Sequence, residues 1–268
     1  MGSVFGSFFT LAVYRLPRKE NITYVRSHCT SCNHKLNFFD LIPIWSYVFL
    51  GGKCRYCKEK IRSRYILLEI FSGIVFLLTA LSLKITTYST LNEFINLGFI
   101  YLFMCAIFII GGIDKEKHEI HDGTILYGIF VSLAYGLFNA FRGISMKYSL
   151  VGFLSYSLIF LVIDVTLKFT MTKEDLPIGF GDIEYVALIG LFLGFGLQTI
   201  SLILATIISV VSIVIQRLKA KDSKINVKNS IPLGYYLSIS TAIVIICAPM
   251  LSGIAELINL SMIWFECV

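Results

Sequence analysis

Long apolar runs separated by short polar turns dominate the chain and predict membrane-spanning helices. Most of these runs approach the roughly 20 residues that an α-helix needs to cross a hydrocarbon core of about 30 Å. The first run is shorter: at about 1.5 Å per residue it reaches only about 21 Å, so either the chain begins earlier or this helix packs among others. The pattern predicts an all-α membrane protein, a polytopic bundle of about eight transmembrane segments, near residues 1–14, 66–83, 94–113, 124–141, 149–167, 183–197, 198–216 and 232–250.

One long polar interval divides the chain. We expect a first transmembrane segment (1–14), a small cysteine-rich loop domain (15–64) and a transmembrane core (66–268). No basic stretch precedes the first apolar segment, so we expect no cleavable signal peptide.

Composition and charge agree with a membrane protein and set its orientation. Hydrophobic residues make up 56% and charged residues 15% of the chain, and the mean hydropathy is +0.79, whereas soluble domains carry about 25% charged residues. With the N-terminus outside, 20 of the 23 Lys and Arg fall on the inner side, 11 of them in residues 15–64, and only Lys84, Arg142 and Lys147 fall outside. This positive-inside bias predicts that the loop domain lies on the cytoplasmic side of the membrane. It also explains the net charge of +6 without a nucleic-acid partner.

Four cysteines in the loop domain form two CxxC pairs. Cys29 and Cys32 are separated from Cys54 and Cys57 by 21 residues. This spacing favours a structural Cys₄ zinc site of the ribbon type, since four thiolates fill a tetrahedral zinc ion. Such a metal would supply folding energy to a loop with little core of its own. Two disulfides, which a reducing cytosol disfavours, and four unrelated thiols remain alternatives.

Two aspartates stand at membrane boundaries. Asp114 ends the segment 94–113 and Asp182 opens the segment beginning at residue 183. A carboxylate at membrane depth costs about 2.5–3.5 kcal/mol on insertion scales, so it usually marks function. Gly179 and Gly181 beside Asp182 permit tight backbone and a close approach of another chain segment. Asp40, in the polar loop, is expected to be simply solvated.

Two carboxyl groups that meet across a bundle have a chemistry of their own. Like charges about 3 Å apart cannot both ionise, so the pair shares one proton: one carboxylate activates water and the other carboxyl polarises a peptide carbonyl. Two alternatives stay open. In the first, Asp182 serves only as a helix cap and Asp114 is only a surface residue at a helix end. In the second, the pair binds a cation in a transporter.

Several stretches, in the same order along nearly the whole chain, resemble the type IV prepilin peptidases, which are bacterial membrane aspartyl proteases of the GxGD group. The stretches are Gly6-Ser7-Phe8, Tyr14-Arg15-Leu16-Pro17, the double CxxC with Gly52-Lys53-Cys54-Arg55, Ile113-Asp114, Gly179-Phe180-Gly181-Asp182 and Ile231-Pro232-Leu233-Gly234.

The resemblance implies an enzyme that removes the basic leader from type IV prepilins or pseudopilins at the cytoplasmic face, for pilus assembly, competence or type II secretion. It implies Asp114 and Asp182 as the catalytic pair, and a second activity that methylates the new N-terminus with S-adenosylmethionine. Glu69 is a weak candidate for binding that cofactor, and pairing with Arg62 or Tyr65 is its structural alternative. A loop domain that only docks other assembly proteins, without catalysis, is a further alternative.

The sequence departs from the family pattern in two places. His121 stands where proline is usual, which makes Asp122 a competitor of Asp114 for the catalytic role. Glu184 stands where lysine often follows the GxGD motif, and this changes the charge beside Asp182 but leaves the pair intact.

Overall fold

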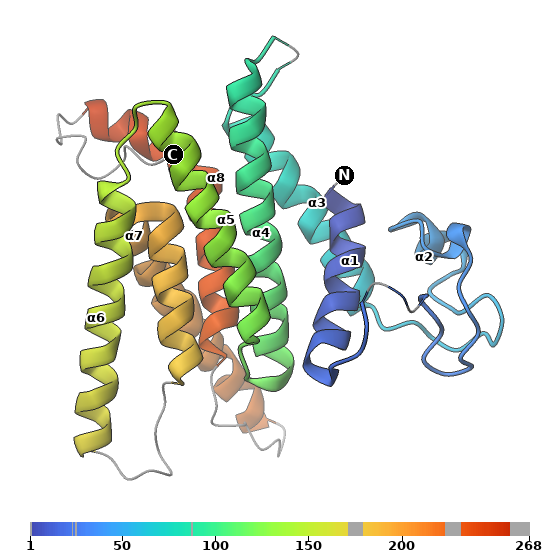
Figure 1. Ribbon diagram of the computed structural model, residues 1–268. Coiled ribbons are helices and arrows are strands. Elements are labelled where there is room, and N and C mark those ends of the chain that lie inside the picture. Colours follow the sequence, from blue (N-terminus) through green and yellow to red (C-terminus); the bar gives the residue numbers. More distant parts are fainter. Residues whose placement is uncertain are drawn as a thin grey trace. The chain divides into compact units, whose positions relative to one another are not determined.

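The structure is a computed structural model that describes residues 2–22, 24, 26–86, 88–170, 179–222 and 232–257. Within these residues the secondary structure is helical apart from two isolated β-bridges, which confirms the all-α prediction. The helices are drawn in Figure 1, and their bounds are α1 (Gly2–Arg15), α2 (Trp45–Phe49), α3 (Arg64–Ser82), α4 (Leu91–Lys117), α5 (Asp122–Phe141), α6 (Lys147–Thr170), α7 (Phe180–Asp222) and α8 (Leu233–Leu257), with short 3₁₀ helices η1 (Leu16–Arg18) and η2 (Phe38–Asp40).

The chain folds as two compact units, Met1–Lys84 and Ile85–Val268. In the first unit α1 packs on α3, and small residues allow the contact: a Cβ on Gly6 would collide with the side chain of Ser72. The hydroxyl of Ser72 donates to the carbonyl of Gly2 at 3.0 Å. The three-part division expected from the sequence stays a prediction, but α3 belongs here with α1 and the loop.

The second unit is a bundle of α4 to α8. Helix α4 contacts α5 and α8, and α7 contacts α5, α6 and α8. Aromatic side chains pack its core: the rings of Phe103 and Phe192 stack with centroids 3.8 Å apart, and Tyr135 lies 4.8 Å from Phe192. Helix α4 begins at a capping box made by Thr90 and Glu93 and therefore has a well-defined start.

Five of the described helices, α3 to α7, are long and apolar enough to cross a membrane. The exact count of eight segments stays a prediction. Helix α7 combines the two segments expected at 183–197 and 198–216, and its helical backbone breaks at Gly194, where φ is 75° and ψ is 175°. Only glycine adopts this conformation readily, so the break is fixed by that residue.

Candidate active site and cysteine cluster

Asp114 lies in the last turn of α4 and is buried, with 5% of its surface exposed. The backbone N–H of Tyr235, in the first turn of α8, donates to Oδ2 of Asp114 at 2.9 Å. The first N–H groups of a helix lack partners within the helix, and the helix dipole there favours negative charge. The start of α8 therefore provides a site that suits a carboxylate.

A buried polar link holds α8 in this position. The hydroxyls of Tyr185 (α7) and Ser238 (α8) lie 2.6 Å apart, and Ser238 donates to the carbonyl of Gly234 at 2.7 Å. A Cβ on Gly111 would collide with the side chain of Ser238, so this glycine lets α4 approach α8 closely. These contacts join three helices directly beside Asp114.

Asp182 lies in the first turn of α7, and its Oδ2 accepts from the backbone N–H of Gly179 at 3.1 Å. A Cβ on Gly181 would lie 3.0 Å from Cβ of Ile120, so the glycine brings this turn against the residues that follow α4. Ile120 lies six residues after Asp114, and Gly181 directly precedes Asp182. The structure therefore places the two predicted aspartates at the same end of the bundle.

Asp122, the competitor of Asp114, has a different setting. It is exposed at the first position of α5. His121 precedes it as the helix cap, with Nδ1 accepting from the N–H of Gly123 at 3.2 Å. In this place Asp122 suits the helix dipole.

The two CxxC segments fold into twin turns. The N–H of Cys29 donates to the carbonyl of His34, and the N–H of Cys54 donates to that of Glu59. In each turn the fourth residue after the first cysteine, Asn33 or Lys58, has a positive φ and returns its N–H to the cysteine carbonyl. Each turn thereby presents its two thiols in the same way.

The four thiols converge on one point. The sulfurs of Cys29, Cys32, Cys54 and Cys57 all lie within 4.8 Å of one another, and those of Cys29 and Cys57 are 3.8 Å apart. Zinc–sulfur bonds of about 2.3 Å in a tetrahedron place the sulfurs about 3.8 Å apart. The donor set and its spacing therefore fit a zinc ion.

The cluster also separates the acidities of its thiols. Partial burial opposes ionisation of Cys29, but the backbone N–H groups of Cys32 and Ser31 outweigh it and lower the pKa of Cys29 to about 7. A backbone hydrogen bond at Glu59 favours the Cys57 thiolate, yet burial and the neighbouring sulfurs raise the pKa of Cys57 to about 12. The neighbouring groups thus move the pKa values of Cys29 and Cys57 in opposite directions.

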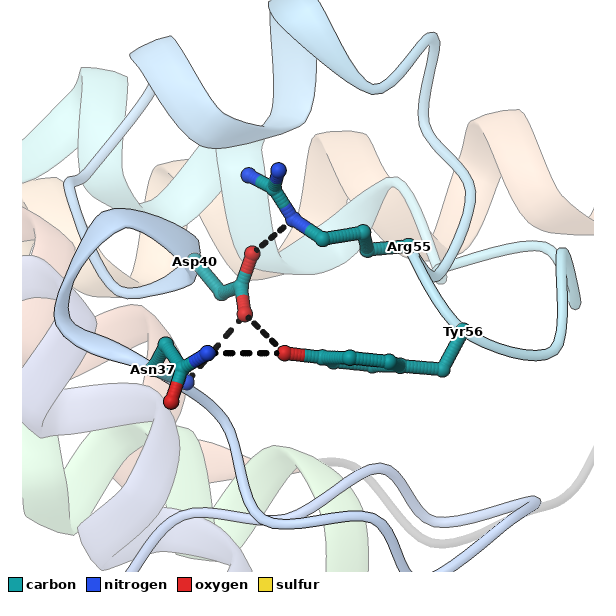
Figure 2. Close-up of polar contacts among 4 residues, drawn as sticks. All are labelled: Asn37, Asp40, Arg55 and Tyr56. Carbon is teal, nitrogen blue, oxygen red and sulfur yellow. Dashed lines mark hydrogen bonds and ion pairs between the residues drawn. The ribbon is translucent and has the colours of Figure 1, made fainter.

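A polar cluster braces the loop beside the second CxxC turn (Figure 2). Asp40 accepts from Nε of Arg55 at 2.7 Å, from the hydroxyl of Tyr56 at 3.2 Å and from the N–H of Asn37 at 3.1 Å. Its side chain is only 3% exposed. The expectation that Asp40 is simply solvated is therefore wrong: it ties η2 to the cysteine turn.

Glu69, the weak cofactor candidate, has a backbone partner. Its Oε2 accepts from the N–H of Ile44 at 2.8 Å, which is neither of the pairings expected with Arg62 or Tyr65. Ile44 has a φ of 64°, and a β-branched residue rarely takes a positive φ. Glu69 thus holds the start of α2 on α3, and the described residues give no contact that assigns it to a cofactor.

Comparison with known families covers both units. The family model described as the bacterial peptidase A24 N-terminal domain matches residues 1–83, and the model described as the type IV leader peptidase family matches residues 101–214. By these two models together the chain resembles the type IV leader peptidase family over most of its length. The resemblance inferred from the motifs is confirmed.

Several known proteins match most of the chain. A prepilin leader peptidase/N-methyltransferase of Vibrio cholerae is 27% identical over 90% of this chain and 92% of its own length. Proteins of the same name from Pseudomonas putida and Pseudomonas aeruginosa are each 24% identical over 90% of this chain and 86% of their own lengths. No solved structure matches the chain.

Two contacts beside Asp114 were not found from the sequence. One is the hydrogen bond from Tyr235 to Asp114. The other involves Lys115, whose Nζ lies 2.9 Å from the Tyr235 hydroxyl and 4.1 Å from the centre of its ring. The sequence signal that could have indicated these contacts is the motif Ile231-Pro232-Leu233-Gly234, which directly precedes Tyr235. Ile231 itself lies outside the described residues.

Proposed function

We propose that this chain is a membrane aspartyl endopeptidase that removes the leader peptide from type IV prepilin-like proteins. The observation that carries the proposal is the buried carboxyl of Asp114, held by the start of α8 at the end of the bundle where the first turn of α7, with Asp182, approaches Ile120. The family models and the shared name of the relatives support the same reaction.

The two carboxyl groups supply acid and base together. They hold one proton between them, because like charges at close range cannot both ionise. The charged carboxyl takes a proton from water, whose oxygen attacks the scissile carbonyl carbon, while the protonated carboxyl donates to the carbonyl oxygen. The carbon–nitrogen bond then breaks as the carboxyl that is now protonated gives its proton to the leaving amine. The other carboxylate takes a proton from a hydroxyl of the tetrahedral intermediate, so the pair again holds one proton.

A zinc ion bound by Cys29, Cys32, Cys54 and Cys57 is proposed as a structural element of the loop domain. The spacing of the sulfurs supports it. Four thiolates leave no open position on the metal, so it orders the loop and takes no part in hydrolysis.

The second proposed activity is methylation of the newly exposed N-terminus. It rests on the name N-methyltransferase that the relatives carry, and S-adenosylmethionine would supply the methyl group. No residue is proposed to bind this cofactor, because Glu69 already bonds to Ile44.

The proposed location is the cytoplasmic face of a bacterial inner membrane, with prepilins or pseudopilins as substrates and surrounding lipid as the medium. The charge distribution supports this orientation, since Lys115 and Lys117 directly follow Asp114 on the predicted inner side. Cleavage at that face would free an N-terminus where cytoplasmic methyl donor is present.

The test is prepilin cleavage in matched membranes by the unmodified chain, Asp114→Asn and Asp182→Asn. Asparagine keeps the shape of the side chain but cannot exchange the proton, so both substitutions should abolish cleavage. Asp122→Asn is the matched control and should cleave normally, because Asp122 is exposed at the start of α5. A folded Asp114→Asn or Asp182→Asn protein that cuts at the normal rate would refute the pair.

A further inference from the structure

An exposed apolar surface gathers around α2 in the loop domain. The rings of Trp45 and Phe49 stack with centroids 5.6 Å apart and are 63% and 78% exposed. Aromatic side chains of η2 extend this surface. We call the surface the aromatic face, and its residues are Phe38, Phe39, Leu41, Trp45, Val48 and Phe49, all exposed. Apolar patches of this kind in water mark a protein or membrane contact.

The aromatic face is fixed at the level where α3 enters the membrane. Helix α2 begins directly after Ile44, whose N–H bonds to Glu69. Glu69 is five residues into α3, about 8 Å along a helix axis from Arg64, and α3 is one of the candidate spans. The start of α2 therefore lies beside the first two turns of a membrane helix.

Charge around the aromatic face suits an anionic lipid surface. Residues 15–64 contain 11 Lys and Arg against three acidic residues, Glu20, Asp40 and Glu59, and Asp40 is neutralised by Arg55. A hollow of about 590 Å³ opens between η2 and α2, lined by Phe39, Trp45 and Arg55 among others. Asp40 and Arg55 both line the hollow and pair with each other, so the attraction to anionic lipid comes from the other basic residues of the loop.

We propose that the aromatic face lies in the headgroup region of an anionic bilayer, with Trp45 and Phe49 inserted and the surplus basic residues of the loop near lipid phosphates. Tryptophan is enriched at this depth because its ring is apolar and its N–H is polar. An amphipathic segment flanked by basic residues binds the interface through buried apolar area and attraction to anionic lipid. The role of the contact is to seat the loop domain against the membrane surface.

Tryptophan fluorescence of the full chain tests the proposal. The chain has two tryptophans, so Trp264→Phe leaves Trp45 as the sole reporter. The protein is placed in bilayers that contain anionic lipid brominated near the headgroup, or the same lipid without bromine. The expected result is a blue-shifted emission that loses most of its intensity only with the brominated lipid.

A matched control uses the opposite side of α2. A Cβ on Gly52 would lie 3.0 Å from the ring of Tyr47, so Tyr47 packs onto the loop itself. With Trp45→Phe and Trp264→Phe, a reporter made by Tyr47→Trp should be quenched much more weakly, whereas one made by Phe49→Trp should behave as Trp45 does. Two results would overturn the proposal: emission typical of water and quenched by aqueous iodide, or a blue-shifted emission that brominated lipid leaves unchanged, which would mean that protein covers the face.

Discussion

At the residue scale, Gly234 allows the start of α8 to approach the carboxyl group of Asp114 in α4 closely. A Cβ at this position would lie 3.1 Å from Oδ2 of Asp114, so Gly234→Val must displace the carboxyl. A misplacement of about 1 Å costs roughly 100-fold in rate, and we expect a loss of prepilin cleavage of that order. Gly98→Val is the control, since no atom lies within 4 Å of its Cβ position. Cleavage at the normal rate by Gly234→Val would show that Asp114 tolerates the shift.

The contacts of Asp40 lead to a separate prediction about the stability of the loop domain. Burial alone raises the pKa of Asp40, but the hydrogen bond and charge of Arg55 and the N–H of Asn37 outweigh it, so the pKa lies below its ordinary value. The stabilisation is therefore fully present above the unfolded pKa of about 3.9 and is lost as the pH falls through the lower folded value. At neutral pH, Asp40→Asn should cost on the order of 1 kcal/mol, because Arg55 is half exposed and screened.

Limited proteolysis of the loop domain measures this change. Asp40→Asn should be cut faster within residues 26–64 than the unmodified chain at neutral pH. Glu59→Gln, another loop acid but an exposed one, should leave the rate as it is. Equal cleavage rates for all three proteins would show that the ion pair of Asp40 and Arg55 does not stabilise the loop domain.

At the element scale, the break in α7 depends on one residue. The φ of 75° and ψ of 175° at Gly194 lie in a region that is essentially restricted to glycine and costs other residues about 1–3 kcal/mol. Gly194→Ala should therefore lower the thermal unfolding temperature of the detergent-solubilised protein. Gly98→Ala, on the open side of α4, should change it little. An unchanged transition in Gly194→Ala would mean that α7 bends elsewhere at no cost.

The twin cysteine turns predict a metal-dependent fold of the loop domain. One zinc ion per chain is expected by metal analysis, and a chelator should make all four cluster thiols react with an alkylating reagent. Cys29→Ser should lose the metal, because a tetrahedral site with three thiolates binds it more weakly. Cys247→Ser should retain the metal, since Cys247 lies outside the cluster. Metal-free protein whose four thiols already react freely would contradict the site.

The sequence predicted those features that depend on residues close to one another in the chain. Apolar runs predicted the helices, and CxxC spacing predicted the converging thiols. It could not show the bond from Tyr235 to Asp114, because the two residues are 121 positions apart and only packing brings them together. The bond from Ile44 to Glu69 and the burial of Asp40 were missed for the same reason: a carboxylate in a polar loop or at a membrane boundary carries no sign of its partner.

At the scale of the whole molecule, the orientation in the membrane is the remaining prediction. Helix α5, 20 residues long, separates the turn after α4 from the turn before α6, a distance of about 30 Å. An α5 that spans the bilayer would place the two turns on opposite sides of it. The positive-inside bias predicts that Glu119, with the loop residue Lys58, faces the cytoplasm and that Arg142 faces outward.

Cysteine labelling of intact cells tests that orientation with single exposed positions. In a zinc-loaded chain, whose four cluster thiols are protected by the metal, and with Cys105, Cys247 and Cys267 replaced by serine, a membrane-impermeant maleimide added outside should label Arg142→Cys but neither Lys58→Cys nor Glu119→Cys. Once the membrane is opened, all three should react, because each position is exposed. Labelling of Glu119→Cys from outside would show that the topology is the reverse of the predicted one. Asp114, five residues earlier in the last turn of α4, would then face away from the cytoplasm.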